Sequence, residues 1–227
     1  MKGKLIVIDG TDGSGKGTQS ALLIERLSRE GKEAKLADFP QYGQSSAFFV
    51  EKYLRGEYGT LESVDAYKAS LFYALDRYDA SFHMRKWLDL GTIIVSNRYV
   101  SSNMGHQAGK IADPKEREKF LAWLKDLEYG MLAIPRPDVN ILLFMPPEVG
   151  QSLVDKKGDR AYTQGKKRDL HEGDIEHLRH ASKAYREVAL REGWRIINCV
   201  KEDGATPRAI EAIHEEVYEH LKTKGVV

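Results

Sequence analysis

The chain has 227 residues, a formal net charge of +1 and a hydrophobic fraction of 41%. This is enough to bury one large α/β domain or two small ones, and because no linker divides the chain we expect a single domain over residues 1–227. The near-neutral charge argues against nucleic acid or an anionic membrane surface as a partner, and no apolar stretch is long enough to span a bilayer.

The compartment is predicted from the cysteine content and the N-terminal pattern. Cys199 is the only cysteine, so no internal disulfide can form and a reducing compartment is favoured. Residues 1–4 are basic, but the apolar run after them is too short for a signal peptide. The cytoplasm is therefore the expected location.

The first predicted elements are a buried strand and a helix joined by a glycine-rich turn. Leu5–Asp9 is apolar up to its last residue, and Lys16–Glu30 has helical periodicity with Gly31 at the position of a C-terminal cap. Between them the chain reads Gly-Thr-Asp-Gly-Ser-Gly. Backbone N–H groups of such a turn, together with the helix N-terminus, can cradle phosphate oxygens.

The turn matches most of a phosphate-binding loop. Gly10, Gly15 and Lys16 meet the pattern G-x-x-x-x-G-K, and Lys16 can reach the outer phosphates of a nucleoside triphosphate. The hydroxyl that should follow, to hold magnesium, is replaced by Gly17 and arrives only at Thr18. An ordinary glycine-rich connection is the alternative, but the strand before and the helix after favour the phosphate loop.

A second strand, Glu33–Ala37, leads into a loop that contains Phe39 and Tyr42. Such a loop at the carboxyl edge of a sheet is a plausible ligand wall. The alternative is a packed turn with Phe39 in the core, since aromatic side chains are usually buried.

Two helices are predicted next, over Ser45–Arg55 and Ser63–Leu90. In the longer one, Tyr73 and Arg77 are four residues apart and share a face. An aromatic ring and a guanidinium in this arrangement can stack on a flat base and donate to its edge. An aromatic stripe in the core beside a surface arginine is the alternative.

The third predicted strand, Thr92–Ser96, is followed by Arg98 and by polar residues. Arg98 would lie just beyond the carboxyl end of the strand, facing the phosphate loop, where it can clamp a phosphate. A structural ion pair is the other interpretation. Ser102 and Asn103 offer polar groups for a base edge.

The remaining elements continue the alternation of strands and helices. A helix begins at Asp113-Pro114, and the later elements are the strand Val139–Phe144, the helix Glu176–Arg191, the strand Trp194–Cys199 and the helix Pro207–Lys222. This order predicts a parallel sheet with helices on both faces and ligands at the carboxyl ends of its strands.

Residues 155–174 form a polar, basic segment without an apolar stripe of its own. One interpretation is a solvated loop. The other is a lid whose cations close over a transferring phosphoryl group. His171, His177 and His180 fall in or near this segment, but their spacing matches no metal-ligand pattern.

Taken together, these residues resemble the thymidylate kinase family of P-loop nucleoside monophosphate kinases. The resemblance runs from Leu5 to about Cys199 and rests on five motifs in order: Gly10–Thr18, Phe39-Pro40-x-Tyr42-Gly43, Ala74-Leu75-Asp76-Arg77, Arg98-Tyr99-x-x-Ser102-Asn103 and Arg168-Asp169-x-x-Glu172. It implies a three-layer α/β P-loop kinase fold with a five-stranded parallel sheet and a basic lid. It also implies transfer of the γ-phosphoryl group of ATP to dTMP, with Mg²⁺.

The resemblance further implies roles for individual residues. The ATP-binding residues would be Gly10, Thr11, Asp12, Gly13, Ser14, Gly15, Lys16, Gly17 and Thr18. The residues at the acceptor would be Asp12 at the sugar 3′-hydroxyl, Phe39 and Tyr42 along sugar and phosphate, Tyr73 (or else Phe72) stacking on the base, Arg77, Ser102 and Asn103 at the base edge, Arg98 on the phosphate, His106 closing the sugar pocket and Glu172 near sugar and metal. The catalytic residues would be Lys16, Arg98, Asp12, Arg160 and Lys166, of which the four cations neutralise charge during transfer. The Mg²⁺ ligands would be Thr18 and Asp12.

Three positions depart from the family pattern. Asn97 stands where an aspartate usually precedes the arginine after the third strand, and Gln41 stands where many members have an arginine. Gly17 replaces the usual first hydroxyl residue. These departures concern metal and acceptor binding rather than the fold.

Two other functions stay open at this point. One is a kinase of the same class for another acceptor, such as dUMP or another nucleoside monophosphate, or a free nucleoside. The other is a P-loop nucleotide switch with slow ATP hydrolysis. The family resemblance also suggests a homodimer, and a helix with Phe48, Phe49 and Val50 is compatible with an interface or a core.

Overall fold

The computed structural model describes residues 2–61, 63–155, 170–171 and 173–227, and its centre is a five-stranded parallel sheet. The strands run in the order β2-β3-β1-β4-β5. Their bounds are β1 Leu5–Asp9, β2 Ala34–Asp38, β3 Ile93–Asn97, β4 Val139–Phe144 and β5 Arg195–Asn198. The predicted number of strands and their parallel arrangement are confirmed.

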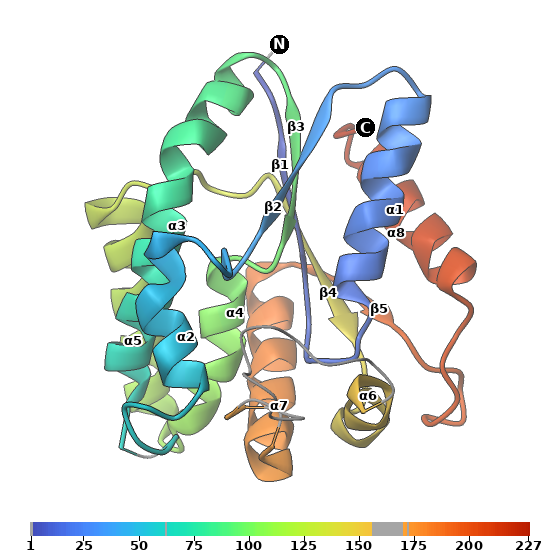
Figure 1. The fold of residues 1–227 in the computed structure, drawn as a ribbon. Helices are drawn as coiled ribbons and strands as arrows, with labels where there is room; N and C mark the ends of the chain where they lie inside the picture. Colours follow the sequence, from blue (N-terminus) through green and yellow to red (C-terminus); the bar gives the residue numbers. More distant parts are fainter. Residues whose placement is uncertain (1, 62, 156–169, 172) are drawn as a thin grey trace.

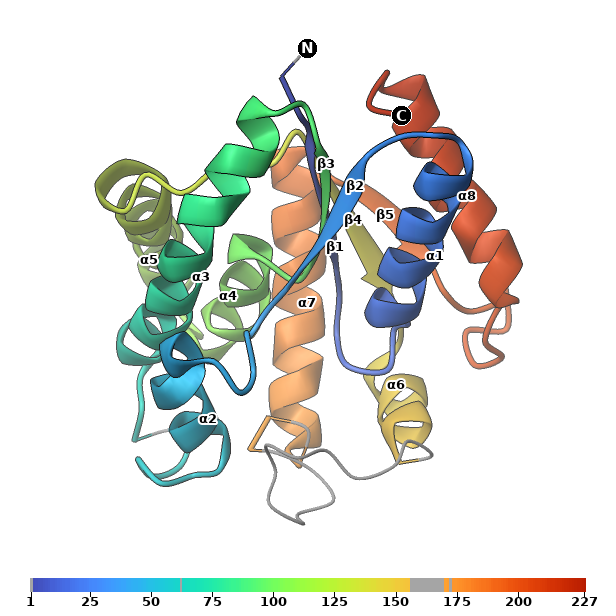
Figure 2. The ribbon, with the colours of Figure 1, turned by 45° about the horizontal axis from the view of Figure 1, so that its top comes forward.

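Helices cover both faces of the sheet (Figures 1 and 2). On one face lie α1 (Lys16–Arg29) and α8 (Ile210–Thr223). On the other lie α3 (Ala66–Asp89), α4 (Val100–His106), α5 (Pro114–Lys125) and α7 (Ile175–Glu192). Near the carboxyl ends of the strands lie α2 (Phe48–Leu54) and α6 (Pro147–Val154).

The central strand β1 belongs to two cores, because alternate side chains point to opposite faces of the sheet. Leu5 and Val7 pack with α3, α4, α5 and α7, whereas Ile6 and Ile8 pack with α1 and α8. All four side chains are fully buried, each contributing roughly 2 kcal/mol of hydrophobic stabilisation. Cys199 lies in the second core, where burial raises the pKa of its thiol to about 12.

Several helices differ from their predicted bounds for local reasons. The single helix expected over Ser45–Arg55 is a 3₁₀ turn, Ser45–Ala47, followed by α2. Helix α3 begins at Ala66 rather than Ser63, because the Asp65 side chain accepts from the backbone N–H of Lys68 and caps it. None of the helices in the described ranges is both long and apolar enough to cross a membrane.

Two of the short elements that were not predicted, α4 and a π-helical turn, matter most for the site. All seven residues of α4 are buried. Because the helix has no solvent-exposed face, its sequence lacks the alternation of apolar and polar residues that identifies a surface helix. After α5 the chain continues into a π-helical turn, Asp126–Met131. Both elements carry residues of the site described below.

Candidate active site

The loop between β1 and α1 has the backbone shape of a phosphate-binding loop. Gly10, Gly13 and Gly15 have φ angles of 152°, 80° and 89°, which other residues rarely adopt. A Cβ on Gly13 would lie 2.1 Å from the carbonyl oxygen of Gly150 in α6. Glycine is therefore needed both for the path of the loop and for its close packing against α6.

Lys16 begins α1 and is held against this loop. Its Nζ donates to the carbonyl oxygen of Thr11 at 2.8 Å and lies 3.5 Å from Asp12 Oδ1. The Lys16 side chain is only 7% exposed, so its ammonium group is fixed at the loop, where phosphate oxygens would bind. Thr18, in contrast, is exposed on α1 and is not among the residues that line the neighbouring cavity.

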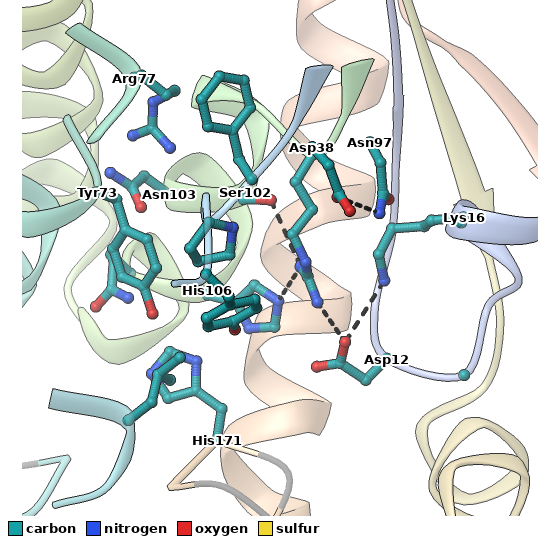
Figure 3. Close-up of a pocket in the computed structure, with 18 of the residues that line it drawn as sticks. Asp12, Lys16, Asp38, Tyr73, Arg77, Asn97, Ser102, Asn103, His106 and His171 are labelled. Carbon is teal, nitrogen blue, oxygen red and sulfur yellow. Dashed lines mark hydrogen bonds and ion pairs between the residues drawn. The ribbon is translucent and has the colours of Figure 1, made fainter. Parts of the chain in front are cut away.

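Arg98 follows β3 with a left-handed backbone, at a φ of 65°. Such a conformation costs a non-glycine residue about 1–2 kcal/mol and persists only where its surroundings hold it. Its Nη2 donates to the Asp12 carboxylate, and its Nη1 lies 3.3 Å from His106 Nε2 and 3.5 Å from Ser102 Oγ (Figure 3). The side chain thus faces the phosphate loop, as the sequence predicted.

The Asp12 carboxylate lies between two cations (Figure 3). Burial raises the pKa of this carboxyl, but Arg98 and Lys16 outweigh burial and hold its pKa well below the usual range. Asp12 is therefore negatively charged at neutral pH and keeps the two cations together.

A second carboxylate, Asp9, fixes the start of the loop. It is 1% exposed and accepts hydrogen bonds from Ser101 Oγ at 2.5 Å, Ser102 Oγ at 2.9 Å and Tyr185 Oη at 2.9 Å. The backbone N–H of Gly10 donates to it as well. Asp9 ties β1 to α4 and α7, and sequence reasoning missed it because its three side-chain partners come from unpredicted or distant segments.

A cavity of about 540 Å³ lies at the carboxyl edge of the sheet, a size that suits a nucleotide. Most of the predicted acceptor residues line it, although they come from four separate parts of the chain. The predicted site residues on its wall are Asp12, Gly13, Gly15, Lys16, Gly17, Phe39, Tyr42, Tyr73, Arg77, Arg98, Ser102, Asn103 and His106.

The aromatic residues of the site divide between wall and core. Phe39 is 4% exposed, and the centre of its ring lies 5.8 Å from that of Tyr99, so it belongs to the core. It also lines the cavity. Tyr73 lines the cavity. Phe72, predicted as its alternative, does not line the cavity and stacks instead on Phe49 at 5.9 Å.

Gln41, one of the departures from the family pattern, anchors the loop after β2. Its Nε2 donates to Asp76 Oδ1 and Ser46 Oγ, each at 3.1 Å, and its backbone N–H donates to Asp76 Oδ2. It is not among the cavity-lining residues. Gln41 therefore holds the loop that carries Phe39 and Tyr42 against α3.

Arg77 is paired inside the protein rather than at its surface. Its Nε donates to Glu128 Oε2 at 2.7 Å, its Nη2 to Glu128 Oε1 at 2.5 Å and its Nη1 to the Tyr99 carbonyl oxygen at 3.3 Å. A guanidinium has five N–H donors, so two remain for a ligand in the cavity that Arg77 lines.

Glu128 is a site residue that sequence reasoning missed. It is fully buried and lies in the π-helical turn after α5. Single π-helical turns are frequent at functional sites because they aim one side chain out of the regular helical pattern. A glutamate within a charged helical run gives no signal of burial, so only the structure identifies it.

The ends of β2 and β3 bring together oxygen atoms beside the loop. Asn97 Nδ2 donates to Asp38 Oδ1 at 2.7 Å, and Asn97 Oδ1 is buried without a hydrogen-bond partner among the described residues. A Cβ on Gly17 would lie 3.8 Å from Asn97 Nδ2. Burial raises the pKa of the Asp38 carboxyl above its usual value, and the hydrogen bond from Asn97 and the cations Arg98 and Lys16 offset this rise only in part.

The predicted lid lies largely outside the described residues. Arg160, Lys166 and Glu172 are among the residues outside those ranges. His171, at the end of this segment, is described: it lines the cavity, and its Nε2 lies 3.0 Å from the hydroxyl of Tyr53.

Comparisons with known proteins agree with one another. A family model described as thymidylate kinase matches residues 8–216. The thymidylate kinase of Mycobacterium tuberculosis is 33% identical over 196 residues, which cover 84% of this chain and 87% of the relative. The human thymidylate kinase is 26% identical over 227 residues, with 95% and 88% covered. A solved structure of thymidylate kinase from Candida albicans superposes with a TM-score of 0.74, over 99% of this chain and 93% of the Candida chain. At 21% sequence identity this similarity concerns the fold.

Proposed function

The chain belongs to the thymidylate kinase family and is therefore a nucleoside monophosphate kinase, and we propose that it transfers the γ-phosphoryl group of ATP to dTMP within the cavity described above. One observation carries the assignment of the site. The cavity has Lys16 and Arg98 on its wall together with Tyr73 and Arg77. Cations that suit two phosphate groups thus line the same cavity as an aromatic ring and a guanidinium that suit a base.

The donor phosphates bind at the loop Gly10–Thr18. Its backbone N–H groups and the N-terminus of α1 provide positive partial charge for the phosphate oxygens. Lys16, fixed between Thr11 and Asp12, adds a full charge for the transferring group. Arg160 and Lys166 of the basic segment are proposed to reach the same phosphates.

The reaction needs charge neutralisation more than proton transfer. The second pKa of a phosphate monoester is about 6, so the acceptor is mostly a dianion at neutral pH and attacks without a general base. What remains is to align two anions and offset their repulsion. Arg98 binds the acceptor phosphate, while Asp12 holds Arg98 beside Lys16 and accepts from the acceptor's 3′-hydroxyl.

The base end of the cavity favours an oxo-pyrimidine. Arg77 has two N–H donors left, and Asn103 donates its Nδ2 to the Ser70 carbonyl oxygen at 3.3 Å, which leaves its Oδ1 as an acceptor. Thymine offers a carbonyl oxygen (O4), which can accept from Arg77, next to an N–H group (N3–H), which can donate to Asn103 Oδ1. Cytosine instead has an amino donor and an unprotonated ring nitrogen at these two positions, so neither contact could form. Tyr73 supplies the stacking face. Phe39, Tyr42, Ser102 and His106 surround sugar and phosphate, and Glu172 is proposed to lie near the sugar.

Magnesium fits the oxygen atoms beside the loop. Mg²⁺ prefers oxygen ligands, and the unpartnered Oδ1 of Asn97 lies next to the Asp38 carboxylate near Gly17. We propose Asp38 and Asn97 as its ligands, directly or through water, with Asp12 as a further oxygen donor. Thr18, the other ligand predicted from the sequence, is exposed on α1 and does not line the cavity. When bound, the ion neutralises charge on the donor phosphates.

An ADP-release assay with ATP, Mg²⁺ and a panel of nucleoside monophosphates tests the function. We expect ADP release to depend on the acceptor and to be fastest with dTMP. Lys16→Ala should lower turnover by about 100-fold or more with the fold kept, since one such charge contact is worth roughly 3 kcal/mol. Lys119→Ala, on the exposed side of α5, is the control. Slow, acceptor-independent hydrolysis would instead indicate a nucleotide switch.

The family's dimeric state is also proposed here, on the basis of an apolar stripe on α3. Leu71, Leu75 and Phe82 are 41%, 49% and 54% exposed and lie one turn or two apart on the helix. Phe48 and Phe49, at the start of α2, are 54% and 47% exposed. We propose that this surface pairs with its copy in a homodimer.

A further inference from the structure

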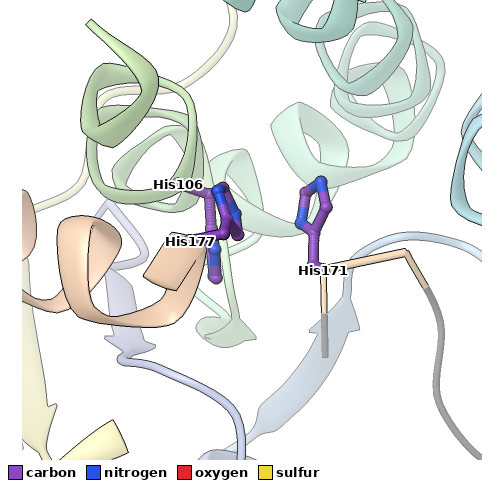
Figure 4. A group of neighbouring side chains, drawn as sticks. All are labelled: His106, His171 and His177. Carbon is purple, nitrogen blue, oxygen red and sulfur yellow. The ribbon is translucent and has the colours of Figure 1, made fainter. Parts of the chain in front are cut away.

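Three histidines meet beside the acceptor cavity (Figure 4). His106 ends α4, His171 lies near the end of the basic segment 155–174 and His177 lies in the first turn of α7. Each offers one ring nitrogen such that the three atoms lie within 4.8 Å of one another, and the residues are only 5–6% exposed. The spacing of the histidines in the sequence did not predict this cluster, because His106 comes from α4, a helix that was not predicted.

Two of the ring nitrogens are buried without a hydrogen-bond partner among the described residues: His106 Nδ1 and His177 Nε2. A buried polar atom without a partner destabilises the folded protein, so two in one cluster indicate a ligand that satisfies both. His171 is held from its other side, with Nε2 3.0 Å from the Tyr53 hydroxyl, which in turn accepts from Lys110 Nζ at 2.8 Å.

We propose that His106, His171 and His177 bind a divalent transition metal ion of the zinc class, separately from the Mg²⁺ of the reaction. Imidazole nitrogen suits zinc, cobalt, nickel and copper, whereas magnesium prefers oxygen. Three histidines with one open position are a known tetrahedral arrangement for zinc. The proposal is independent of the kinase assignment.

The geometry requires a modest closure. At a zinc–nitrogen distance of about 2.0–2.1 Å, tetrahedral ligand atoms lie roughly 3.3 Å apart, so nitrogens now up to 4.8 Å apart must approach by side-chain rotation. The Tyr53 hydroxyl beside His171 can accept its Nε2–H, the kind of outer contact that orients a metal-binding imidazole.

Groups near the cluster determine which hydrogen bonds and protons change when the metal ion binds. Arg98 Nη1 lies 3.3 Å from His106 Nε2. Because arginine can only donate, Nε2 must accept this hydrogen bond, and the single ring proton of neutral His106 is therefore on Nδ1. Metal binding at Nδ1 moves the proton to Nε2 and releases Arg98 from the imidazole. The charges around the cluster are mixed: Arg98 and Lys110 are cationic, while Asp12 and Asp174 act on His177 as anions.

The test is metal binding to the full-length, metal-stripped protein in excess Mg²⁺. Equilibrium dialysis should show one Zn²⁺ per chain, and Co²⁺ should give the intense visible absorption of a tetrahedral nitrogen site. His177→Gln should weaken binding by about 100-fold or more, because even outer partners of a metal ligand are worth 10- to 100-fold. His180→Gln, exposed one turn further on the same helix, should bind as the native protein does.

Two results would overturn the proposal. One is the absence of stoichiometric Zn²⁺ and Co²⁺ binding to the folded native protein. The other is binding that survives both His177→Gln and a second variant, His171→Gln, which also serves if His177→Gln fails to fold. Because dialysis and absorption do not depend on catalysis, failure of the kinase assay leaves these results readable.

Discussion

At the scale of single residues, the two arginines of the cavity differ in how firmly they are held. The side chains of Arg98 and Asp12 are each 18% exposed, so an incoming phosphate can take over part of that ion pair. Arg77 and Glu128 are 2% and 0% exposed, and their pair lies where water does not screen it. Arg98 is thus suited to exchange partners during the reaction, whereas Arg77 presents the same two donors throughout.

Glu128→Gln tests this difference. The amide keeps one acceptor but removes the charge, so Arg77 loses the partner that fixes its orientation. We expect the acceptor KM to rise by about 10-fold while the ATP KM changes little, together with a loss of up to about 3 kcal/mol in unfolding free energy from the uncompensated buried charge. Steady-state kinetics with each substrate varied, and urea unfolding, give both quantities.

The control is Asp126→Asn, in the same π-helical turn but exposed. It should leave both KM values unchanged. Equal increases of the two KM values in Glu128→Gln would indicate general damage to the fold rather than a role in positioning Arg77.

Tyr73→Ala tests the stacking face. Base stacking on an aromatic ring is worth about 1–3 kcal/mol, so the acceptor KM should rise roughly 5- to 150-fold with little change in the ATP KM. Tyr73→Phe keeps the ring and should stay near native. An unchanged acceptor KM in the alanine variant would exclude Tyr73 from the base site.

At the scale of elements, α4 and α7 pack so closely that glycine is required. A Cβ on Gly105 would lie 2.2 Å from the ring of Tyr185, and one on Gly109, in the 3₁₀ turn that follows α4, would lie 2.8 Å from the backbone nitrogen of Ala181. Tyr185 also donates to Asp9, so this contact reaches the start of the phosphate loop.

Gly105→Ala should therefore destabilise the protein. Displacement of the Tyr185 ring is an overpacking change that costs about 1–3 kcal/mol, measured by urea unfolding. In the control Gly130→Ala, the added methyl group meets only the end of the Asp126 side chain, which can turn away. Equal stability of the two variants would contradict a tight α4–α7 contact.

The elements also show which parts of the fold can be predicted from sequence. Strand β1 and the loop after it were identified because apolar residues and glycines have local physical causes. Helix α4 was not, since a helix buried on every side has no amphipathic period. Arg98 could be placed because it follows a predicted strand. His106 could not be placed, because it lies in α4, for which no structure was predicted.

At the scale of the whole molecule, the exposed stripe on α3 predicts association. Phe82→Glu should shift the protein from dimer to monomer in sedimentation equilibrium, because a charge in an apolar interface loses its hydration. Leu90→Glu, at the 79% exposed C-cap residue just after α3, should not cause this shift. A native protein that is monomeric at all tested concentrations would contradict the proposed interface.

Stability should fall in mild acid because of the buried histidines. Burial and nearby cations lower the pKa of His177 to about 4 and those of His106 and His171 well below the usual value, although nearby carboxylates act in the opposite direction. The unfolded chain then binds more protons below about pH 6.5, so stability is complete above that pH and is lost toward about pH 4, at about 1.4 kcal/mol per pH unit for each histidine.

Urea unfolding in a chelating buffer at about pH 7.5 and about pH 5 measures this loss. His177→Gln should show a smaller difference between the two pH values than the native protein. An unfolding free energy that stays constant over this range would show that the imidazoles are hydrated in the folded state.

Long-range partners limit what the sequence could predict of the site. Arg98 was placed at the site because the topology of a parallel sheet brings strand ends together, whereas the role of Asp12 was predicted from the family resemblance of the phosphate loop. Glu128, Asp9 and Tyr185 were missed because each acquires its importance from a partner at least 50 positions away. Propensity and periodicity describe neighbours along the chain and are silent about such pairs.

The single thiol of the chain has a practical consequence. Since Cys199 is enclosed by the second core and its sulfur stays protonated, it should be inert to maleimide and nitroxide reagents in the native protein. Two cysteines introduced at exposed positions on opposite sides of the cavity would then be the reactive labels. Distances across the catalytic cleft could be followed spectroscopically during turnover without first rebuilding the interior.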